Sequence, residues 1–552
     1  MKKLLLTCVI AALLAASCGT ADSKKTGNDG SAALNADSLG KNIAVLASDG
    51  FMGRKPFTEG ETMTVEFLKQ AFKNEGLEPG NGNSYEQEVP MVRITTEAAP
   101  VMKISAPTGD FELKGLDDYV IWTDRTEPVE TLDAADLVFA GYGVVAPEYG
   151  WNDYEGLDVK GKVVLIRVND PGFHNHDTSL FKGNTMTYYG RWTYKFEEAA
   201  RQGAKGCLII HDVEGASYPF TVVQNNWNSS RLRLDNRNKS ETLCDIIGWI
   251  SNEAATRILK AAGKDSTLLA GAGIKGFHGE PLGLKVSASM KVSTTYNKSI
   301  NVIGKITGSK FPEETIIYTA HWDHLGIGKA DETGDSIYNG ALDNASATAG
   351  LLELARAFKS ASVAPERTIV FLSVTAEEQG LWGSAYYALN PVYPLSKTLA
   401  NINMDGLNWY GRTKDIVVVG QGQNELEDYL REAAEKEGRV IAFEAKPEAG
   451  YYYRSDHFNF AKLGVPALYT STGSDVIGQA PGTGKKNEDE YTRDHYHRPS
   501  DEYDPATWKL DGAIADLLLL YQVGRKLDTA ATFPVWKTGS EFKAIREKTG
   551  KP

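Results

Sequence analysis

Acidic and imidazole side chains recur in five short polar segments of the C-terminal half of the chain: AHWDHLG, NGALDNASA, TAEEQG, NINMDG and YHRPSDEYD. The residues are His321, Asp323, Asp343, Glu377, Glu378, Asp405 and His497. Carboxylates and imidazoles together suit zinc, and an aquated metal ion supplies a nucleophile at neutral pH. The residue types therefore indicate a metal-dependent hydrolase.

Three of these segments follow apolar, β-branched runs. TIIYTA precedes His321, TIVFLSV precedes the Glu377-Glu378 pair, and TLANINM precedes Asp405. Such runs predict buried strands of a parallel sheet, and the residues just past their carboxyl ends face the crevice where α/β sheets bind ligands. We therefore expect one imidazole and three carboxylates to converge at this edge. Asp343, in a loop that opens the apolar helix 345–359, and His497, in a late loop, are placed to join them.

Composition limits the other classes of function. The chain has 552 residues, enough for two or three domains, and its 42% apolar and 24% charged residues are ordinary for a globular protein. Its net charge of −13, with no basic run after the first three residues, argues against nucleic acid as a partner.

The N-terminus has the pattern of a targeting signal. Lys2 and Lys3 precede LLLTCVIAALLAAS, an apolar run too short for a typical membrane-spanning helix. Small residues directly before Cys18 resemble a bacterial lipoprotein signal, in which Cys18 becomes the acylated first residue. Ordinary signal cleavage nearby and a bare signal anchor are the alternatives. We expect an exported protein, lipid-anchored in the bacterial cell envelope on the periplasmic side or the cell surface.

Besides Cys18, two cysteines, Cys207 and Cys244, remain in the predicted mature chain. An exported protein could pair them, but two cysteines make no disulfide framework. Cys207 lies in the apolar run GCLIIH, so a buried free thiol is at least as well supported.

Strand and helix patterns alternate from about residue 292 to 525, and helical spacing marks residues 39–50 and 62–80. The stretch 131–290 has a different character, with strand-like runs followed by an amphipathic helix that leads through a Gly turn into another strand. The predicted fold class is α/β: a mixed, largely parallel sheet flanked by helices, with an inserted β-rich domain.

These motifs resemble the clan MH family of zinc aminopeptidases and carboxypeptidases, which has the zinc-dependent exopeptidase fold. The resemblance includes the Gly53-Arg54 turn, the NVIGKI strand, the His-x-Asp and Glu-Glu motifs, and His-Arg-Pro-Ser-Asp. The stretch 131–290 resembles a protease-associated domain. The implied division is a signal peptide 1–18, a flexible tether 19–38, an N-terminal peptidase part 39–130, the protease-associated insert 131–290, and a catalytic part 291–552.

The resemblance also implies a role for each site residue and two Zn²⁺ ions as cofactors. His321 and Asp405 would bind one zinc, Glu378 and His497 the other, and Asp343 would bridge both. Asp323 would accept a hydrogen bond from the second ring nitrogen of His321, and Glu377 would be the general base. His495 is the main rival of His497, and His324 is expected beside the ligands rather than among them.

A second motif of the family lies near its substrate pocket. Here it corresponds to Ser455-Asp456-His457, with Tyr452 three residues before the serine. The resemblance implies that Asp456 and His457 contribute to substrate binding. A hydroxyl at Tyr452 would be placed to hydrogen-bond the oxyanion of the tetrahedral intermediate.

The predicted function is that of an exported zinc-dependent aminopeptidase acting on peptides, with a membrane anchor at Cys18. A carboxypeptidase or dipeptidase of the same fold is an alternative, and Arg454 is the obvious cation for a substrate carboxylate. A glutaminyl cyclase with a single zinc is another. A receptor-like protein that had lost its chemistry would have degraded ligands, and none is missing here.

Overall fold

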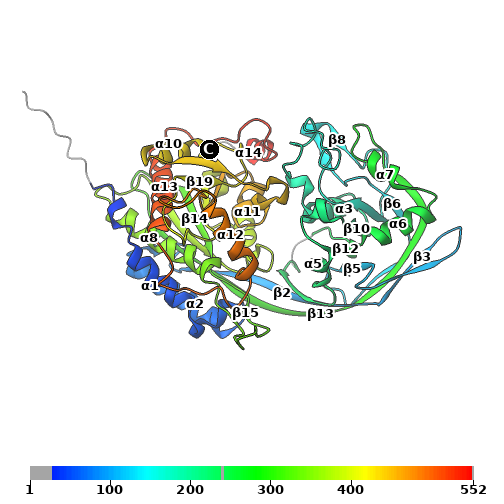
Figure 1. The fold of residues 1–552 in the computed structure, drawn as a ribbon, viewed down its shortest axis with the longest axis horizontal. Helices are drawn as coiled ribbons and strands as arrows, with labels where there is room; N and C mark the ends of the chain where they lie inside the picture. The colour runs from blue at the N-terminus through cyan, green and yellow to red at the C-terminus, as the bar shows by residue number, and fades with distance from the viewer. Residues whose placement is uncertain (1–27, 238–240, 550–552) are drawn as a thin grey trace, which may run out of the picture.

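The computed structural model describes residues 28–237 and 241–549, so the predicted signal peptide and Cys18 lie outside it. Two lobes lie side by side, joined by the long strands β2 (Glu86–Ala98) and β13 (Glu280–Ile306), as Figure 1 shows. These strands pair antiparallel from Glu86 opposite Val302 to Ala98 opposite Met290. The pairing gives the two lobes a continuous backbone connection.

The first lobe is built on a mixed sheet. Its central strands β17, β14, β18 and β21 are parallel in that order, with β13 antiparallel to β17 at one side and β19 antiparallel to β21 at the other. Their bounds are β14 (Phe311–His321), β17 (Arg367–Val374), β18 (Thr398–Asn403), β19 (Asp415–Val418), β20 (Val440–Phe443) and β21 (Ala467–Ser471). This arrangement confirms the predicted fold class.

Helices cover both faces of this sheet. One face carries α1 (Ala36–Leu46), α2 (Glu59–Asn74), α8 (Ala347–Ser360), α10 (Leu426–Lys436) and α13 (Asp511–Asp528); the other carries α9 (Trp382–Leu389) and α11 (His457–Lys462). Successive residues of a strand point to opposite faces. Ile316 and Tyr318 of β14 therefore enter the first core and Ile317 the second. Burial on both faces is why these strands are apolar without interruption.

The second lobe has its own sheet and its own core. The strands β6 (Val129–Phe139), β9 (Val163–Arg167), β10 (Gly206–Ile210) and β12 (Ile246–Ile250) run parallel, and β5 (Tyr119–Trp122) is antiparallel to β12. Helix α3 (Trp192–Arg201) packs on one face and α6 (Asn252–Ala261) on the other. The predicted helix, turn and strand correspond to α3 and β10.

The packing begins this lobe near residue 98 rather than at the predicted 131. Met102 and Ile104 of β3 (Val101–Ser105) and Leu113 of β4 (Phe111–Lys114) are buried in the same cluster as Leu137. The physical reason is that β2 leaves the first lobe beside β13, so that β3, β4 and β5 extend the sheet of the second lobe.

The C-terminal part of the predicted tether is packed against the first lobe. Asn28 donates from Nδ2 to the carbonyl of Ser360 (3.2 Å) and accepts from the backbone N–H of Ser362 (2.8 Å). Helix α1 begins at Ala36 because the Asn35 side chain accepts from the N–H of Ser38 (2.9 Å), a typical N-cap. Residues 28–38 therefore belong to the folded lobe.

Smaller elements complete the chain: α4 (Val213–Ala216), α5 (Phe220–Gln224), α7 (Ser266–Gly271), α12 (Thr483–Asp494), α14 (Lys543–Thr549), β1 (Glu78–Pro79), β7 (Val145–Ala146), β8 (Trp151–Asn152), β11 (Ser230–Leu234), β15 (Gly326–Ile327) and β16 (Ile337–Tyr338). Cys207 and Cys244 are both buried and unpaired. Within the part of the chain that the structure covers, no helix is long and apolar enough to cross a bilayer.

Candidate metal centre

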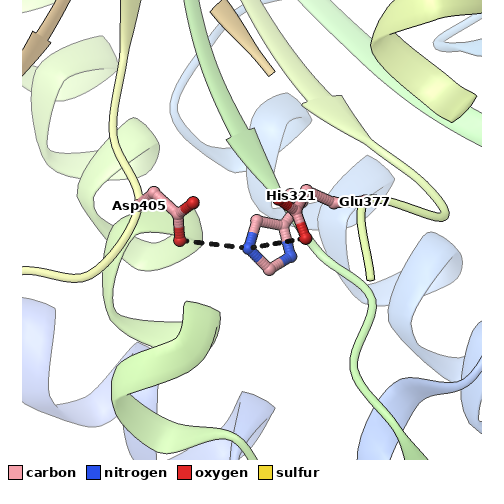
Figure 2. A group of neighbouring side chains, drawn as sticks. All are labelled: His321, Glu377 and Asp405. Atoms are coloured by element: carbon pink, nitrogen blue, oxygen red, sulfur yellow. Dashed lines mark hydrogen bonds and ion pairs between the residues drawn. The ribbon is translucent and has the colours of Figure 1, made fainter. Parts of the chain in front are cut away.

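The predicted ligands gather at the carboxyl edge of the central parallel strands. His321 is the last residue of β14, the Glu377-Glu378 pair follows β17, and Asp405 follows β18. Figure 2 shows the imidazole of His321 between the carboxylates of Asp405 and Glu377. The strand ends thus bring together the residues that the apolar runs predict there.

Two groups of ligand atoms share one carboxylate. Nε2 of His321 lies 3.2 Å from Oδ1 of Asp405 and 3.3 Å from Oδ1 of Asp343. Nε2 of His497 lies 3.1 Å from Oε2 of Glu378 and 3.3 Å from Oδ2 of Asp343. The two oxygens of Asp343 therefore face different groups, as a bridging ligand requires.

The spacing of these atoms fits zinc. Four ligands at about 2.0 Å in a tetrahedron lie roughly 3.3 Å from one another. The distances above, from 3.1 to 3.3 Å, match that edge length in both groups. The nitrogen and oxygen donors of both groups are of the kinds that suit zinc.

Asp343 is held by contacts from distant parts of the chain. The backbone N–H groups of Leu342 and Asp343 donate to the Asp501 carboxylate at 3.0 and 3.2 Å. Arg54, which is 1% exposed, donates to the carbonyls of Gly340 (2.9 Å) and Trp322 (2.8 Å) and so ties this loop to the segment after β14. The sequence marked Arg54 only as part of a turn, and its role depends on the tertiary fold.

Asp405 is oriented by a serine that the sequence analysis assigned no role. Ser455 Oγ donates to Oδ2 of Asp405 (2.7 Å), and Asn403 Nδ2 donates to Ser455 Oγ (2.8 Å). Hydrogen bonds of this kind fix a ligating carboxylate. The one signal in the sequence was the position of Ser455 in the Ser-Asp-His motif.

Replacement of Ser455 by Ala should weaken zinc binding at the His321–Asp405 group. Oδ2 of Asp405 loses its donor, and loss of such an outer contact typically costs about tenfold to a hundredfold in metal affinity or activity. The measurement is the zinc concentration that restores half-maximal activity after chelation. Ser309→Ala, which removes a hydrogen bond to Pro365 (2.9 Å), is the control. An unchanged zinc requirement in Ser455→Ala would contradict the assigned role.

Asp323 makes a different contact from the predicted one. Nδ1 of His321 lies 3.1 Å from the backbone carbonyl oxygen of Asp323 but 3.8 Å from its carboxylate Oδ1. That Oδ1 accepts from the backbone N–H of Glu377 (3.0 Å). The main chain thus provides the acceptor for the His321 ring, and the Asp323 carboxylate positions Glu377.

The two adjacent glutamates have opposite electrostatic environments. Burial raises the pKa of Glu377 well above its usual range. The Asp405 and Glu378 carboxylates also raise this pKa, and the imidazole of His321 lowers it. Burial and Asp343 would also raise the pKa of Glu378, but the imidazoles of His324 and His497 bring it to about 2. A raised pKa makes Glu377 the stronger proton acceptor of the two, and a lowered pKa keeps Glu378 ionised, as a base and a ligand respectively require.

Two other histidines compete with His497 as ligands. His324 forms a compact group with Asp343 and Glu378, and its Nδ1 lies 2.6 Å from Oε1 of Glu378. We favour His497 because its Nε2 lies near one oxygen each of Asp343 and Glu378. His324 instead contacts Oε1 of Glu378, the oxygen that does not face His497. His495 points elsewhere, with Nδ1 3.0 Å from the carbonyl oxygen of Ser500.

The predicted substrate-binding residues are buried behind the centre. Tyr452 is 3% exposed, and its hydroxyl has no partner among the described residues. His457 is fully buried between the rings of Tyr452 (4.6 Å) and Tyr469 (4.7 Å). Asp456 is also buried, which raises its pKa to about 7. None of the three makes a hydrogen bond to the predicted ligands in the part of the chain described.

Tyr496 is the tyrosine that lies open beside the ligands. It is 46% exposed, and its ring stacks on His497 with 3.8 Å between centroids. Desolvation at the hydroxyl end of the ring and the surrounding carboxylates raise the pKa of Tyr496 above its usual range, so the hydroxyl remains a hydrogen-bond donor. The sequence analysis chose Tyr452 instead because it lies three residues before the serine of the Ser-Asp-His motif.

Replacement of His457 by Phe should reduce the sensitivity of folding to acid. Burial lowers the pKa of His457 from 6.5 to about 3. Because the folded state keeps the ring neutral while the unfolded state binds a proton, the wild type loses stability as the pH falls below about 6.5. At pH 5 this loss is up to about 2 kcal/mol. Urea unfolding at pH 7.5 and pH 5 measures the free energy of unfolding of both proteins. An equal loss of stability in wild type and His457→Phe would contradict a His457 ring that stays neutral in the folded state.

The fold and the centre define a class: a metallo-exopeptidase, a hydrolase acting on peptide bonds. Residues 301–522 match the model of peptidase family M28, and this segment belongs to that family. It contains every predicted zinc ligand and Glu377.

Individual proteins are similar to this chain over different lengths. Aminopeptidase YwaD of Bacillus subtilis (strain 168) is 28% identical over 417 residues, which cover 74% of this chain and 70% of YwaD. A probable zinc metalloprotease of Leptosphaeria maculans is 41% identical over 88 residues, covering 16% of this chain and 20% of its own. Among solved structures, the aminopeptidase from Aneurinibacillus sp. strain AM-1 aligns with 93% of this chain and 97% of its own, at 19% identity and a TM-score of 0.48.

Proposed function

We propose that the chain is a dizinc aminopeptidase that removes N-terminal residues from peptides. The observation that carries the proposal is the pair of ligand groups that share Asp343, each spaced for one zinc ion. The similarity to YwaD, an aminopeptidase by name, over 74% of this chain supports the amino-terminal direction.

Zinc, when bound, would acidify water and polarise the scissile carbonyl. His321 and Asp405 would hold one ion, His497 and Glu378 the other, and Asp343 both. Glu377, positioned through its backbone N–H by Asp323, would accept a proton from the attacking water and return it to the leaving amine. Tyr496 would donate a hydrogen bond to the oxygen on which negative charge develops.

Hydrolysis of matched substrates tests this proposal. Leucine p-nitroanilide should be cleaved in a zinc-dependent manner, and its N-acetyl counterpart at least about a hundredfold more slowly, because catalytic interactions depend on correct placement of the substrate. Release of C-terminal residues from N-acetylated peptides would instead identify a carboxypeptidase. Conversion of N-terminal glutamine to pyroglutamate would identify a cyclase.

We also propose that the second lobe is a protease-associated domain inserted in the peptidase. The order of elements supports this: helix α3 is followed by a turn at Gly203 and then by the buried strand β10. Its separate apolar cores are what an insert that folds as a unit requires.

Export and lipid anchoring form a further proposal, based on the sequence around Cys18. Replacement of Cys18 by Ala should release the protein from membranes or stop its maturation, because the acylated thiol would be the anchor. Membrane fractionation and mass spectrometry of the N-terminus measure this. Normal membrane retention with an unmodified Cys18 would refute it.

A further inference from the structure

Strand β11 comes from the second lobe but lies against the loop that carries Glu377. β11 pairs antiparallel with β2, one of the two strands that join the lobes. Leu232 of β11, which is 7% exposed, belongs to the same buried apolar cluster as Ala376, the residue before Glu377. Leu234 and Trp382 pack against that cluster. The contact therefore reaches both ends of the loop, at Ala376 and at Trp382.

The arginines of β11 fix this strand to the second lobe. Successive residues of a strand point to opposite faces, so the arginines alternate with the two leucines. The guanidinium of Arg231 lies 3.9 Å from the ring centroid of Trp122 in β5. Arg233 pairs with Asp124, which follows β5, and its guanidinium also lies 5.4 Å from the ring centroid of Trp382. β11 is thus held by one lobe while its leucines pack on the other.

The loop that β11 contacts, residues 376–382, is closed by its own main chain and is called the base loop below. The N–H of Leu381 donates to the carbonyl of Glu377 at 2.9 Å. The N–H of Trp382 donates to the carbonyl of Ala376 at 3.0 Å. A displacement of either end of the base loop therefore moves Glu377 as well.

Ala376 has a backbone conformation that needs support from its surroundings. Its φ is +52°, in the left-handed region, where the Cβ of an L-residue crowds the following carbonyl. Such a conformation persists only where the surrounding structure holds it. Ala376 is fully buried, and the cluster around it consists of Leu232 together with Val89 and Met91 of β2. This packing fixes the direction in which the main chain enters Glu377.

We propose that Leu232 is a positioning residue for Glu377, through which the second lobe holds the base loop in the geometry that proton transfer needs. A general base must lie within hydrogen-bond reach of the proton it accepts, and a small displacement is costly in rate. Leu232 is not among the predicted ligands and acts only through the base loop. The inference rests on the proposed role of Glu377 and gives the inserted lobe a part in the chemical step.

Replacement of Leu232 by Ala tests the inference, because the base loop relaxes into the space that the side chain leaves. At saturating zinc, kcat for leucine p-nitroanilide should fall at least about tenfold, the effect of a modest misplacement of the base. KM and the zinc content should stay at the wild-type values, since His324 holds the Glu378 ligand separately at 2.6 Å. Leu232→Met, which restores most of the apolar volume, should recover most of kcat.

The same change elsewhere in the second lobe is the control. Leu132 is 2% exposed in a core of that lobe that does not include the base loop. Leu132→Ala should therefore keep the wild-type kcat. An equal loss of kcat in Leu132→Ala and Leu232→Ala would overturn the inference, because it would show a general loosening of the lobe.

A double-mutant cycle tests whether Leu232 acts through Glu377. In the Glu377→Gln background, Leu232→Ala should lower kcat by less than about threefold, because the group that it positions is already absent. The same fold-loss in both backgrounds would overturn the inference, since a merely structural role would act equally in each.

Failure of the inference and failure of the proposed function give different results. An unchanged kcat in Leu232→Ala, with turnover lost in Glu377→Gln, removes the positioning role and leaves the peptidase function standing. Full activity of Glu377→Gln contradicts the general base and the inference together. If circular dichroism shows that Leu232→Ala is unfolded, the smaller truncation Leu232→Val takes its place, and an unchanged kcat in that variant also overturns the inference.

Discussion

Replacement of Glu377 by Gln should lower the turnover of an aminoacyl substrate by at least about a hundredfold while leaving the zinc content unchanged. The amide has the size of the carboxylate but cannot accept the proton, and general base catalysis contributes at least about this factor. KM should change little, because the loss falls mainly on the transition state. Steady-state kinetics and elemental analysis of the same preparation measure both quantities.

Replacement of Glu378 by Gln is the matched control, since it makes the same chemical change one residue away. It should weaken the His497 group, and excess zinc should partly restore activity. If Glu377→Gln loses metal while Glu378→Gln keeps both ions, the two roles are reversed. If both variants are fully active, the hydrolase assignment fails at this site.

Replacement of Asp343 by Ala should remove both ions and reduce activity to background. Its two oxygens lie 3.3 Å from His321 and from His497, so that one change removes a ligand from each group. Asp265→Ala, which removes only an N-cap of the short helix α7, should retain zinc and activity. Retention of one tightly bound ion by Asp343→Ala would show that the carboxylate does not bridge.

The sequence predicted the parts of the centre that depend on local pattern. Uninterrupted apolar runs mark strands buried on both faces, and His321, the Glu377-Glu378 pair and Asp405 follow such runs directly. Because parallel strands place their carboxyl ends at one edge, their convergence followed from topology alone.

Contacts between distant segments could not be predicted in this way. Ser455 reaches Asp405 across 50 residues, and Arg54 reaches Gly340 across 286. No periodicity encodes such contacts. Whether the backbone carbonyl or the carboxylate of Asp323 lies next to Nδ1 of His321 depends on the path of the main chain, which residue types do not specify.

Two expectations differ from what the structure favours, because local signals marked other segments. The lobe boundary falls near 98 because β3, β4 and β5, which are only four or five residues long, join the second sheet. Tyr452 belonged to a recognisable motif but is buried, whereas Tyr496 lies open beside His497. Burial is a tertiary property, and only the folded structure distinguishes these tyrosines.

The zinc content of active protein tests the central claim most directly. The mature protein is stripped with a chelator and titrated with zinc while hydrolysis of leucine p-nitroanilide and bound metal are both followed. We predict two ions per chain in the fully active protein and loss of activity on their removal. Full activity with one ion, or with none, would contradict a dizinc centre bridged by Asp343.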